Sequence, residues 1–257
     1  MSDSIVIIPT YKEKENIEAI IHAVFSLPQP FDILIVDDNS PDGTGAIADE
    51  LAREYSVRVS HRSGKLGLGT AVVAGFAAAT AEIVGVMDAD FSHPPALVPR
   101  MLATLTATEA DVVVASRYVP GGSTPNWPFR RRLLSRAACL LARPLTPIRD
   151  AASGFFLIRR EIVRGVRIQA GGFKICLELL VRAWPQRLVE LPYQFDDREL
   201  GESKMSLREA AGYLVQLRDL YWSRWTGRGR RRRSYRQLTV GGVESLMKSG
   251  NAFSTLR

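Results

Sequence analysis

Two carboxylates that follow an apolar run are the residues best placed to do chemistry. Residues 82–87 read Glu-Ile-Val-Gly-Val-Met, and Asp88, Ala89 and Asp90 come directly after them. Side chains two apart on a strand share a face, so both aspartates can point at one cation while Ala89 leaves room beside them. Hard cations such as Mg²⁺ or Mn²⁺ take carboxylate oxygens and share their other positions with substrate phosphates. The stretch therefore predicts a metal and diphosphate site.

The position of this triplet strengthens a signal that is weak by itself. At ordinary Asp usage an Asp-x-Asp triplet arises by chance about once in a few hundred residues. Ligands of open α/β sheets, however, gather beyond the carboxyl ends of strands, and this pair follows a run typical of a buried strand. We therefore expect a nucleotide diphosphate to bind here.

The elements that must position these carboxylates follow an alternating pattern. Short apolar runs alternate with amphipathic segments through residues 4–115, which predicts βα units on a largely parallel sheet. We expect strands at residues 4–9, 31–36, 57–60, 82–87, 111–116, 153–158 and 188–195. Helices are expected at residues 17–24, 44–54, 70–80, 95–106, 174–183 and 206–225, with a further helix starting at Phe129. The fold class is therefore α/β.

The chain is long enough for one large domain with an appendage, and its charge is uneven. It has 257 residues, 46% of them hydrophobic, and a formal net charge of +7. Seven arginines and no acid lie between Arg224 and Arg236, so this cluster accounts for the whole excess. Such a cluster indicates a local anionic partner, a membrane surface or nucleic acid, or else a solvated basic tail.

Cysteine usage and hydropathy limit where the protein is expected to work. Cys139 and Cys176 lie far apart without ligand spacing, so we expect neither a disulfide framework nor a zinc site, and a reducing cytosol fits. The first residues show no basic region or cleavage site of a secretory signal. No apolar run reaches the roughly 20 residues needed to span a bilayer. We expect a protein that is soluble or lies on a membrane.

Two amphipathic segments leave core packing and membrane contact as alternatives. In the helix that starts at Phe129, apolar residues are flanked by arginines, which suits either a core-packed helix or one lying in lipid headgroups. The segment 206–225 ends in Tyr221, Trp222 and Trp225, directly before the arginine cluster. Aromatic rings beside basic residues are favoured at a membrane–water interface. Core packing of its apolar stripe is equally compatible.

Several motifs, in order, closely resemble those of polyprenol- (dolichol-) phosphate mannose synthases. These enzymes belong to the second glycosyltransferase family and have the GT-A fold. The matching stretches are Pro-Thr-Tyr-Lys-Glu-Lys-Glu-Asn at 9–16, Val-Asp-Asp-Asn-Ser-Pro-Asp-Gly-Thr at 36–44, Asp-Ala-Asp-Phe-Ser-His-Pro at 88–94, Ala-Ser-Arg-Tyr at 115–118, Asp-Ala-Ala-Ser-Gly-Phe at 150–155 and Arg-Glu-Leu-Gly-Glu-Ser-Lys at 198–204. The resemblance covers about residues 4–206 and implies a Rossmann-like, mixed and mostly parallel sheet flanked by helices.

The resemblance implies transfer of mannose from GDP-mannose to a polyprenyl phosphate, with inversion and with Mg²⁺ or Mn²⁺. Asp88 and Asp90 would hold the metal, with Asp90 the principal ligand. The donor would be bound by Pro9, Tyr11, Glu13, Val36, Asp38, Asp88, Ala89, Asp90, Arg117, Arg198 and Lys204. Asp88, Asp90, Arg117, Arg198 and Lys204 would be the catalytic set, and Arg117, Arg131 and Ser135 would meet the acceptor phosphate. Because that phosphate is already an anion at neutral pH, no general base is needed.

The resemblance also implies a division of the chain and a location. Residues 1–205 are expected to form the GT-A domain, 206–227 an amphipathic interfacial helix and 228–257 a basic tail without fixed structure. The protein would act peripherally on the cytoplasmic face of a membrane, with or without an anchoring partner protein, and no nucleic acid is expected.

Three alternatives stay open. Glucose-transferring relatives share the metal motif, so UDP-glucose is an alternative donor. A soluble or glycan hydroxyl is an alternative acceptor, although that reaction would need a general base. A nucleic-acid binder that uses the arginine cluster is a remote third reading, because it leaves the aspartates unexplained.

Overall fold

An eight-stranded sheet with helices on both faces forms the described part of the chain. The computed structural model describes residues 2–169, 174–196, 207–226, 233–239, 241–242 and 244–245. The strands are β1 (Ser4–Thr10), β2 (Asp32–Asp37), β3 (Val57–His61), β4 (Ile83–Val86), β5 (Val112–Ser116), β6 (Phe156–Arg159), β7 (Arg187–Pro192) and β8 (Ser234–Gln237). Their order in the sheet is β3-β2-β1-β4-β6-β5-β7-β8.

Only β6 runs against its neighbours among these strands. It pairs antiparallel with β4 and with β5, whereas every other pair in the sheet is parallel. The carboxyl ends of β1, β2, β4, β5 and β7 therefore lie at one edge of the sheet, where α/β proteins bind ligands. The predicted mixed, mostly parallel sheet is confirmed.

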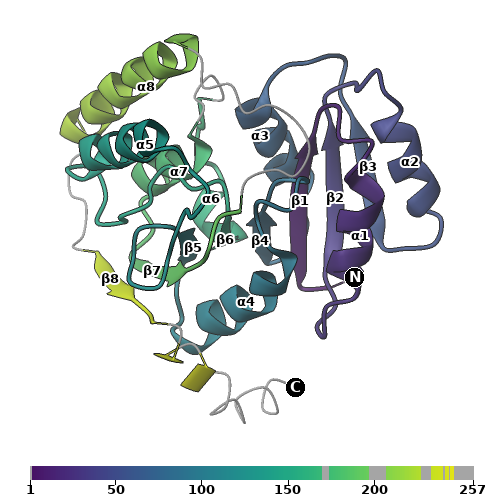
Figure 1. Ribbon diagram of the computed structural model, residues 1–257, viewed down its shortest axis with the longest axis horizontal. Helices are drawn as coiled ribbons and strands as arrows, with labels where there is room; N and C mark the ends of the chain where they lie inside the picture. The colour runs from purple at the N-terminus through teal and green to yellow at the C-terminus, as the bar shows by residue number, and fades with distance from the viewer. Residues whose placement is uncertain are drawn as a thin grey trace.

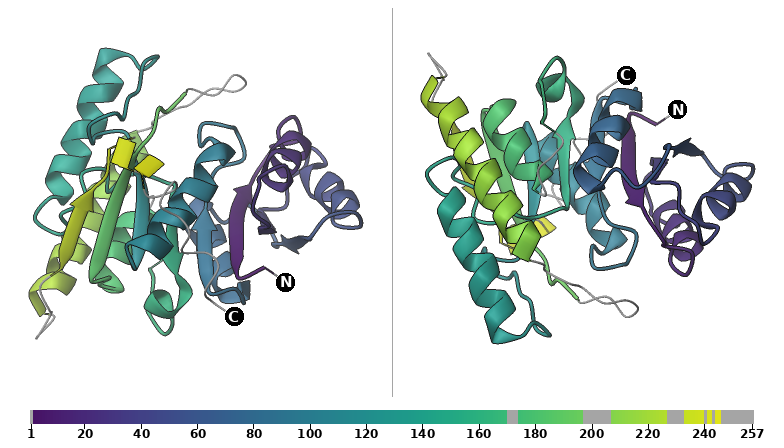
Figure 2. Two further views of the ribbon diagram at one scale, coloured as in Figure 1. Left: turned by 90° about the horizontal axis from the view of Figure 1, so that it is seen from below. Right: turned by 90° about the horizontal axis from the view of Figure 1, so that it is seen from above.

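The helices cover the two faces of the sheet because successive strand residues point to opposite sides. They are α1 (Ile17–Phe25), α2 (Thr44–Leu51), α3 (Leu68–Ala78), α4 (Val98–Ala107, preceded by a short 3₁₀ turn at Pro95–Leu97), α5 (Phe129–Ala142), α6 (Arg160–Val163), α7 (Ile175–Arg182) and α8 (Leu207–Thr226). Val6 and Ile8 of β1 pack with α1 and α4 in one buried cluster, and Ile5 and Ile7 pack with α3, α7 and α8 in the other. Figures 1 and 2 show the resulting three layers, with α5 and α8 side by side at one end.

The predicted elements are confirmed to within a few residues, but the short helix α6 was not predicted, and two further features differ. β4 ends at Val86, so Asp88 and Asp90 lie on the following loop, and the expectation that strand alternation aligns them is wrong. β8 lies inside the stretch expected to be a basic tail and pairs in parallel with β7, so the sheet extends past residue 228. No helix in the described part of the chain has both the length and the hydropathy to cross a membrane.

The contact between α3 and β1 depends on a glycine. A Cβ added at Gly75 would lie 2.7 Å from Cγ2 and 2.9 Å from Cδ1 of Ile7, whose side chain is fully buried. Real Cβ atoms do not approach other atoms so closely, and a packed core has little room to move. Glycine at this position therefore lets the helix pack closely on the first strand.

We expect Gly75→Ala to lower the free energy of unfolding by about 1 kcal/mol. In a helix Ala gains about 1 kcal/mol over Gly, but overpacking a core costs about 1–3 kcal/mol, so the clash with Ile7 outweighs the gain. Urea denaturation measures the difference. In an Ile7→Val background, which removes Cδ1, the same change should cost less. A Gly75→Ala protein more stable than the wild type would contradict the close contact.

Candidate active site

The polar residues predicted to form the site gather along the carboxyl edge of the sheet. Tyr11 and Glu13 follow β1, Asp38 follows β2, Asp88 and Asp90 follow β4, and Arg117 follows β5. Because these strands run in the same direction, segments far apart in the sequence meet at this edge (Figure 1). The edge therefore carries carboxylates on the side of β2 and β4 and a guanidinium on the side of β5.

The loop after β4 holds its two aspartates in different environments. Asp90 is buried, and its Oδ1 accepts hydrogen bonds from the amide of Ser92 at 3.1 Å and its hydroxyl at 2.6 Å. The side chain of Asp88 is 30% exposed. The amide of Asp88 donates to Nδ1 of His93 at 2.9 Å, so this nitrogen is an acceptor. His93 thus fixes the backbone that presents Asp88.

His93 is held as a neutral ring under the site. It is buried, its ring stacks on Phe155 with centroids 5.0 Å apart, and Tyr193 and Phe195 approach its edges. Burial lowers the pKa of His93, although the neighbouring carboxylate of Asp88 acts in the opposite direction. The sequence motifs assigned His93 no role beyond its place in the stretch at 88–94. The structure adds a positioning contact, because the acceptor nitrogen is occupied by the Asp88 amide.

The two aspartates fit a divalent cation that is shared with a substrate. Among the described residues no group of three or more His, Cys, Asp or Glu could hold a metal, so a closed structural site is not formed there. An open pair of hard carboxylate ligands, one of them partly exposed, suits a cation whose other positions are filled by phosphates and water. Nδ1 of His93 already accepts a hydrogen bond, so that atom is not a further ligand.

The carboxylate of Asp38 ties β2 to the loop before α3. Its Oδ2 accepts the amides of Leu66 at 3.0 Å and Gly67 at 2.8 Å, and its Oδ1 is paired with the guanidinium of Arg62. The neighbouring Lys65 lies with Nζ 4.1 Å from the ring centroid of Tyr11. This arrangement brings two cations, absent from the predicted set, next to the predicted nucleotide residues.

Other residues expected around a nucleotide divide into loop and core positions. Oε2 of Glu13 accepts a hydrogen bond from Asn16 at 2.8 Å, and its amide donates to Thr44 at 3.0 Å, so it joins the loops after β1 and β2. Pro9, Val36 and Ala89 are buried, and Val36 and Ala89 belong to the apolar clusters. Their side chains pack into the protein at this edge, and their expected contact with the donor stays a prediction.

A buried ion pair joins Arg117 to Asp150. Nε donates to Oδ2 at 2.7 Å, Nη2 donates to Oδ1 at 2.6 Å, and the Arg117 amide donates to Oδ2 at 2.9 Å. Burial by itself lowers the pKa of Arg117, but the Asp150 charge outweighs this and raises it above its usual value. Arg117 was expected to clamp phosphate with a planar fork, yet that fork is directed at Asp150.

A second buried carboxylate supports this pair from β7. Glu190 accepts the amides of Arg149 at 2.8 Å and Asp150 at 2.9 Å, and it also accepts the hydroxyl of Tyr235 on β8. Desolvation raises the pKa of Glu190, while these three hydrogen bonds act to lower it. The C-terminal strand therefore helps to hold the loop that holds Arg117.

The acceptor-side candidates lie at the start of α5. Arg131 places its guanidinium 4.0 Å from the ring centroid of Trp127, and Tyr118 donates its hydroxyl to Ser135 at 2.6 Å. Arg117, Arg131 and Ser135 are thus grouped around the Tyr118 and Trp127 rings. Arg198 and Lys204, the remaining predicted cations, lie outside the described residues.

Helices α5 and α8 form a pair with an apolar outer face. Tyr213 of α8 donates to the carbonyl of Ala138 at 2.6 Å, and Tyr221 donates to that of Leu141 at 2.7 Å. The exposed apolar side chains of the pair are Phe129, Leu133, Leu134, Leu140, Leu141, Leu214, Val215, Tyr221, Trp222 and Trp225. Exposed apolar patches of this kind mark surfaces that contact a partner or a membrane. Both helices also contribute buried residues to the core, so core packing is shown for both, whereas membrane contact stays a prediction.

Comparison with known proteins identifies the family. The family model described as "Glycosyl transferase family 2" matches residues 5–167, which is more than half of the chain. The chain belongs to glycosyltransferase family 2. It is a glycosyltransferase with a GT-A-like sheet, as predicted.

Two relatives and one solved structure show how far this likeness extends. The chain is 43% identical over 222 residues to "Polyprenol monophosphomannose synthase" from Mycolicibacterium smegmatis, covering 80% of this chain and 83% of that one. It is 40% identical over 228 residues to "Dolichol-phosphate mannosyltransferase" from Pyrococcus furiosus, covering 86% of this chain but only 64% of that one. A mannosyltransferase from Pyrobaculum calidifontis, solved with GDP-Man and Mn²⁺, shares the fold with a TM-score of 0.60 at 16% identity, covering 99% of this chain and 76% of that one.

This family-2 glycosyltransferase contains site residues that sequence reasoning missed. Arg62, His93 and Glu190 were not predicted to act, and Asp150 was only part of a matching motif. A lone buried Glu in an apolar strand, at position 190, was the one available signal, because such a carboxylate needs partners. Arg62 and Asp150 depend on contacts between distant segments, whereas His93 lies only five residues from Asp88 and its contact depends on how that loop folds.

Removing the Asp150 charge tests the ion pair. We expect Asp150→Asn to lower the free energy of unfolding of this glycosyltransferase by about 3–5 kcal/mol, because it leaves the buried Arg117 without a counter-charge. Chemical denaturation followed by circular dichroism measures it. Glu109→Gln is the matched control, since its pair with Arg187 is exposed and its loss should cost at most about 1 kcal/mol. Equal, small losses in both variants would contradict the structural role of the buried pair.

Proposed function

We propose that this glycosyltransferase moves mannose from GDP-mannose to the phosphate of a polyprenyl lipid, with inversion at the anomeric carbon. The observation that carries the lipid acceptor is the apolar outer face of α5 and α8, which begins beside the loop of Arg117. A soluble acceptor would give no reason to expose so many large apolar side chains together. Mannose is supported by the names of the relatives that are 40% and 43% identical.

In this proposal Asp88 and Asp90 hold a Mg²⁺ or Mn²⁺ ion. When bound, the ion would neutralise the charge that develops on the leaving diphosphate. Asp90 is pre-oriented by Ser92, and Asp88 is presented by the hydrogen bond from its amide to His93. These contacts place the carboxylates before any ligand arrives, so little ordering is left to be done on binding.

The nucleotide would bind over the ends of β1 and β2. Tyr11 and Glu13 border this region, and Asp38 holds the loop that carries Lys65. A lysine at this position can meet a phosphate as a point charge. Arg198 and Lys204 belong to the proposed donor and catalytic set by resemblance alone.

The acceptor side needs positioning more than proton transfer. A phosphate monoester is already an anion at neutral pH, so attack needs no base, and the neutral His93 has its Nδ1 occupied. Arg131 and Ser135 would meet the acceptor phosphate. Arg117 would contribute its charge from within its pair with Asp150, with two of its donors used there. Orientation and fixed charges then carry the step.

The proposed location follows from the same surface. Residues 1–205 would form the catalytic domain and 206–227 the interfacial helix, with β8 returning the tail to the sheet. The protein would lie on the cytoplasmic face of a membrane, alone or with an anchoring partner protein.

A donor and acceptor screen tests this function. With Mn²⁺ or Mg²⁺, purified protein should form a mannosyl lipid from GDP-mannose and polyprenyl phosphate in detergent, and the anomeric configuration of the product should be inverted. UDP-glucose with the same acceptor, and GDP-mannose with a soluble glycan, are the parallel arms. Transfer only from UDP-glucose would overturn the donor, and transfer only to the glycan would overturn the acceptor.

We expect Asp90→Asn to reduce transfer by about three orders of magnitude, because a catalytic metal supplies several kcal/mol of charge stabilisation. Initial rates of mannosyl-lipid formation measure this change. Electron paramagnetic resonance measures the binding of Mn²⁺ in the presence of GDP, and this binding should also become weaker. Asp49→Asn is the control, since Asp49 lies half exposed on α2 in a pair with His61 and is not among the residues proposed to bind the metal or the donor. Near-normal rates in Asp90→Asn would refute the metal role.

A further inference from the structure

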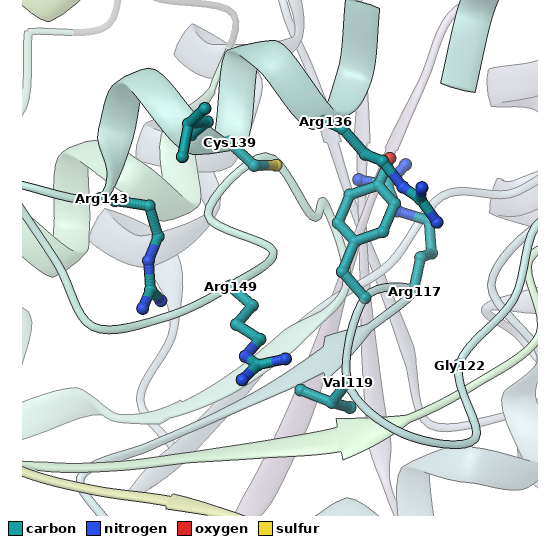
Figure 3. Close-up of a pocket in the computed structure, with 9 residues that line it drawn as sticks. Arg117, Val119, Gly122, Arg136, Cys139, Arg143 and Arg149 are labelled. Carbon is teal, nitrogen blue, oxygen red and sulfur yellow. The ribbon is translucent and has the colours of Figure 1, made fainter. Parts of the chain in front are cut away.

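A cavity on the other side of the Arg117 loop is lined by arginines and by no acid. Its volume is about 400 Å³, and its lining residues are Arg117, Tyr118, Val119, Gly122, Arg136, Cys139, Leu140, Arg143 and Arg149. Figure 3 shows Arg136 and Cys139 on α5 and Arg143 directly after its end, with Arg149 and Val119 on the other side of the space. Burial raises the pKa of the Cys139 thiol to about 12, so it adds no negative charge.

The cavity lies beside the sites already described and shares only Arg117 with them. None of Asp38, Asp88, Asp90, Arg131 and Ser135 lines it. Tyr118 stands between the cavity and the acceptor candidates, because its ring borders the cavity while its hydroxyl donates to Ser135. The Arg117 guanidinium is already paired with Asp150, so the anion-binding capacity belongs to the three outer arginines.

Within the described part of the chain these outer arginines have no carboxylate partner. Arg136 lies 5.8 Å from the ring centroid of Tyr118, and Nη1 of Arg143 donates to the carbonyl of Pro147 at 2.5 Å. Arg149 uses its amide, not its side chain, to bind Glu190. Three like charges at one cavity repel one another and are stabilised by an anion, above all by a phosphate that matches the guanidinium fork.

Hydrogen bonds hold in place the loop that carries Arg149 at one side of the cavity. Glu190 holds the amides of Arg149 and Asp150, so the loop that carries Arg149 is fixed from the core. Arg224 and Arg233 both donate to the carbonyl of Leu145 in the same loop, which joins it to the end of α8. The arginines are thus displayed on an ordered surface, as a binding site requires.

The cavity opens at the apolar face. Leu140 lines it and is 70% exposed, and the adjacent Leu141 carbonyl accepts the hydroxyl of Tyr221 on α8. Trp222 and Trp225 follow Tyr221, and Trp225 is 87% exposed. At a membrane surface, tryptophan rings sit at headgroup depth while arginine heads reach the phosphates. The cavity mouth would then face the layer of lipid phosphates.

We propose that the cavity of Arg136, Arg143 and Arg149 binds the phosphate of an anionic phospholipid headgroup, so that the bilayer itself docks the enzyme beside its acceptor. This inference rests on the proposed membrane function and adds a second lipid site to it. Its role is to orient α5 and α8 on the membrane. The attraction of basic residues to an anionic leaflet supplies the binding free energy.

Vesicle co-sedimentation of the full chain tests the site. Vesicles of phosphatidylcholine alone are compared with vesicles that also contain phosphatidylglycerol, neither carrying polyprenyl phosphate. Arg143→Gln/Arg149→Gln should bind the phosphatidylglycerol vesicles at least about tenfold more weakly than the wild type. The matched control is Arg130→Gln/Arg132→Gln, which removes the same charge from exposed positions of α5 outside the cavity and should weaken binding at most about threefold. Circular dichroism checks that each variant is folded.

Four results would overturn the proposal. Equal losses in the two double variants would show that only net charge matters, and equal losses on phosphatidylcholine vesicles would show that no anionic headgroup is recognised. A raised KM for polyprenyl phosphate in detergent, with vesicle binding unchanged, would assign the cavity to the acceptor. Inorganic phosphate at matched ionic strength should compete only weakly, and full competition would point to a free phosphate ligand. The two proposals can fail separately. If the proposed function is wrong, the wild type makes no mannosyl lipid, but the vesicle binding of the variants still tests the cavity.

Discussion

The ion pair between Arg117 and Asp150 is the interaction on which the arrangement of the site depends. It is buried, it uses the Nε and Nη2 edge of the guanidinium and it is reinforced by the Arg117 amide. Two charges removed from water are costly unless they are well paired and hydrogen-bonded, and Asp150 accepts three hydrogen bonds from Arg117. Glu190 fixes the backbone of this pair by accepting the Asp150 amide. A single charge pair therefore holds together the loop after β5, the loop before β6 and strand β7.

The buried ion pair of Arg117 and Asp150 explains how the fold separates charges of opposite sign. On the β4 side, Asp88 and Asp90 provide two carboxylates, one partly exposed and one buried. On the α5 side, Asp150 takes up the charge of Arg117, while Arg136, Arg143 and Arg149 remain without acids among the described residues. The proposed cation-dependent donor site and the proposed lipid-binding side can thus lie close together without neutralising each other, because the buried pair between them has almost no net charge.

Much of the fold could be predicted because its signals are local. Strand and helix positions follow from the periodicity of apolar residues, and Asp88, Asp90 and Arg117 stand directly after apolar runs that end at one sheet edge. The partners of Arg117 could not be predicted in the same way, since Asp150 lies 33 residues away and Glu190 a further 40. β8 was missed because a four-residue edge strand in a basic stretch has little periodicity to detect. Strand alternation failed at Asp88 and Asp90 because the loop begins before them.

The position of α5 links the buried ion pair of Arg117 and Asp150 to the apolar outer face of α5 and α8. Its inner residues Cys139 and Ala142 are buried against the Arg117 region and the core, while Leu133, Leu134, Leu140 and Leu141 point outward. In a helix with apolar side chains on opposite faces, the core covers only one face. The other face stays exposed to water unless a protein or a membrane covers it. The α8 helix covers only part of the outer face through Tyr213 and Tyr221. The uncovered part is what a bilayer would bury, and burial there would bring the lipid phosphates to the side of Arg117 that carries the cavity of Arg136, Arg143 and Arg149.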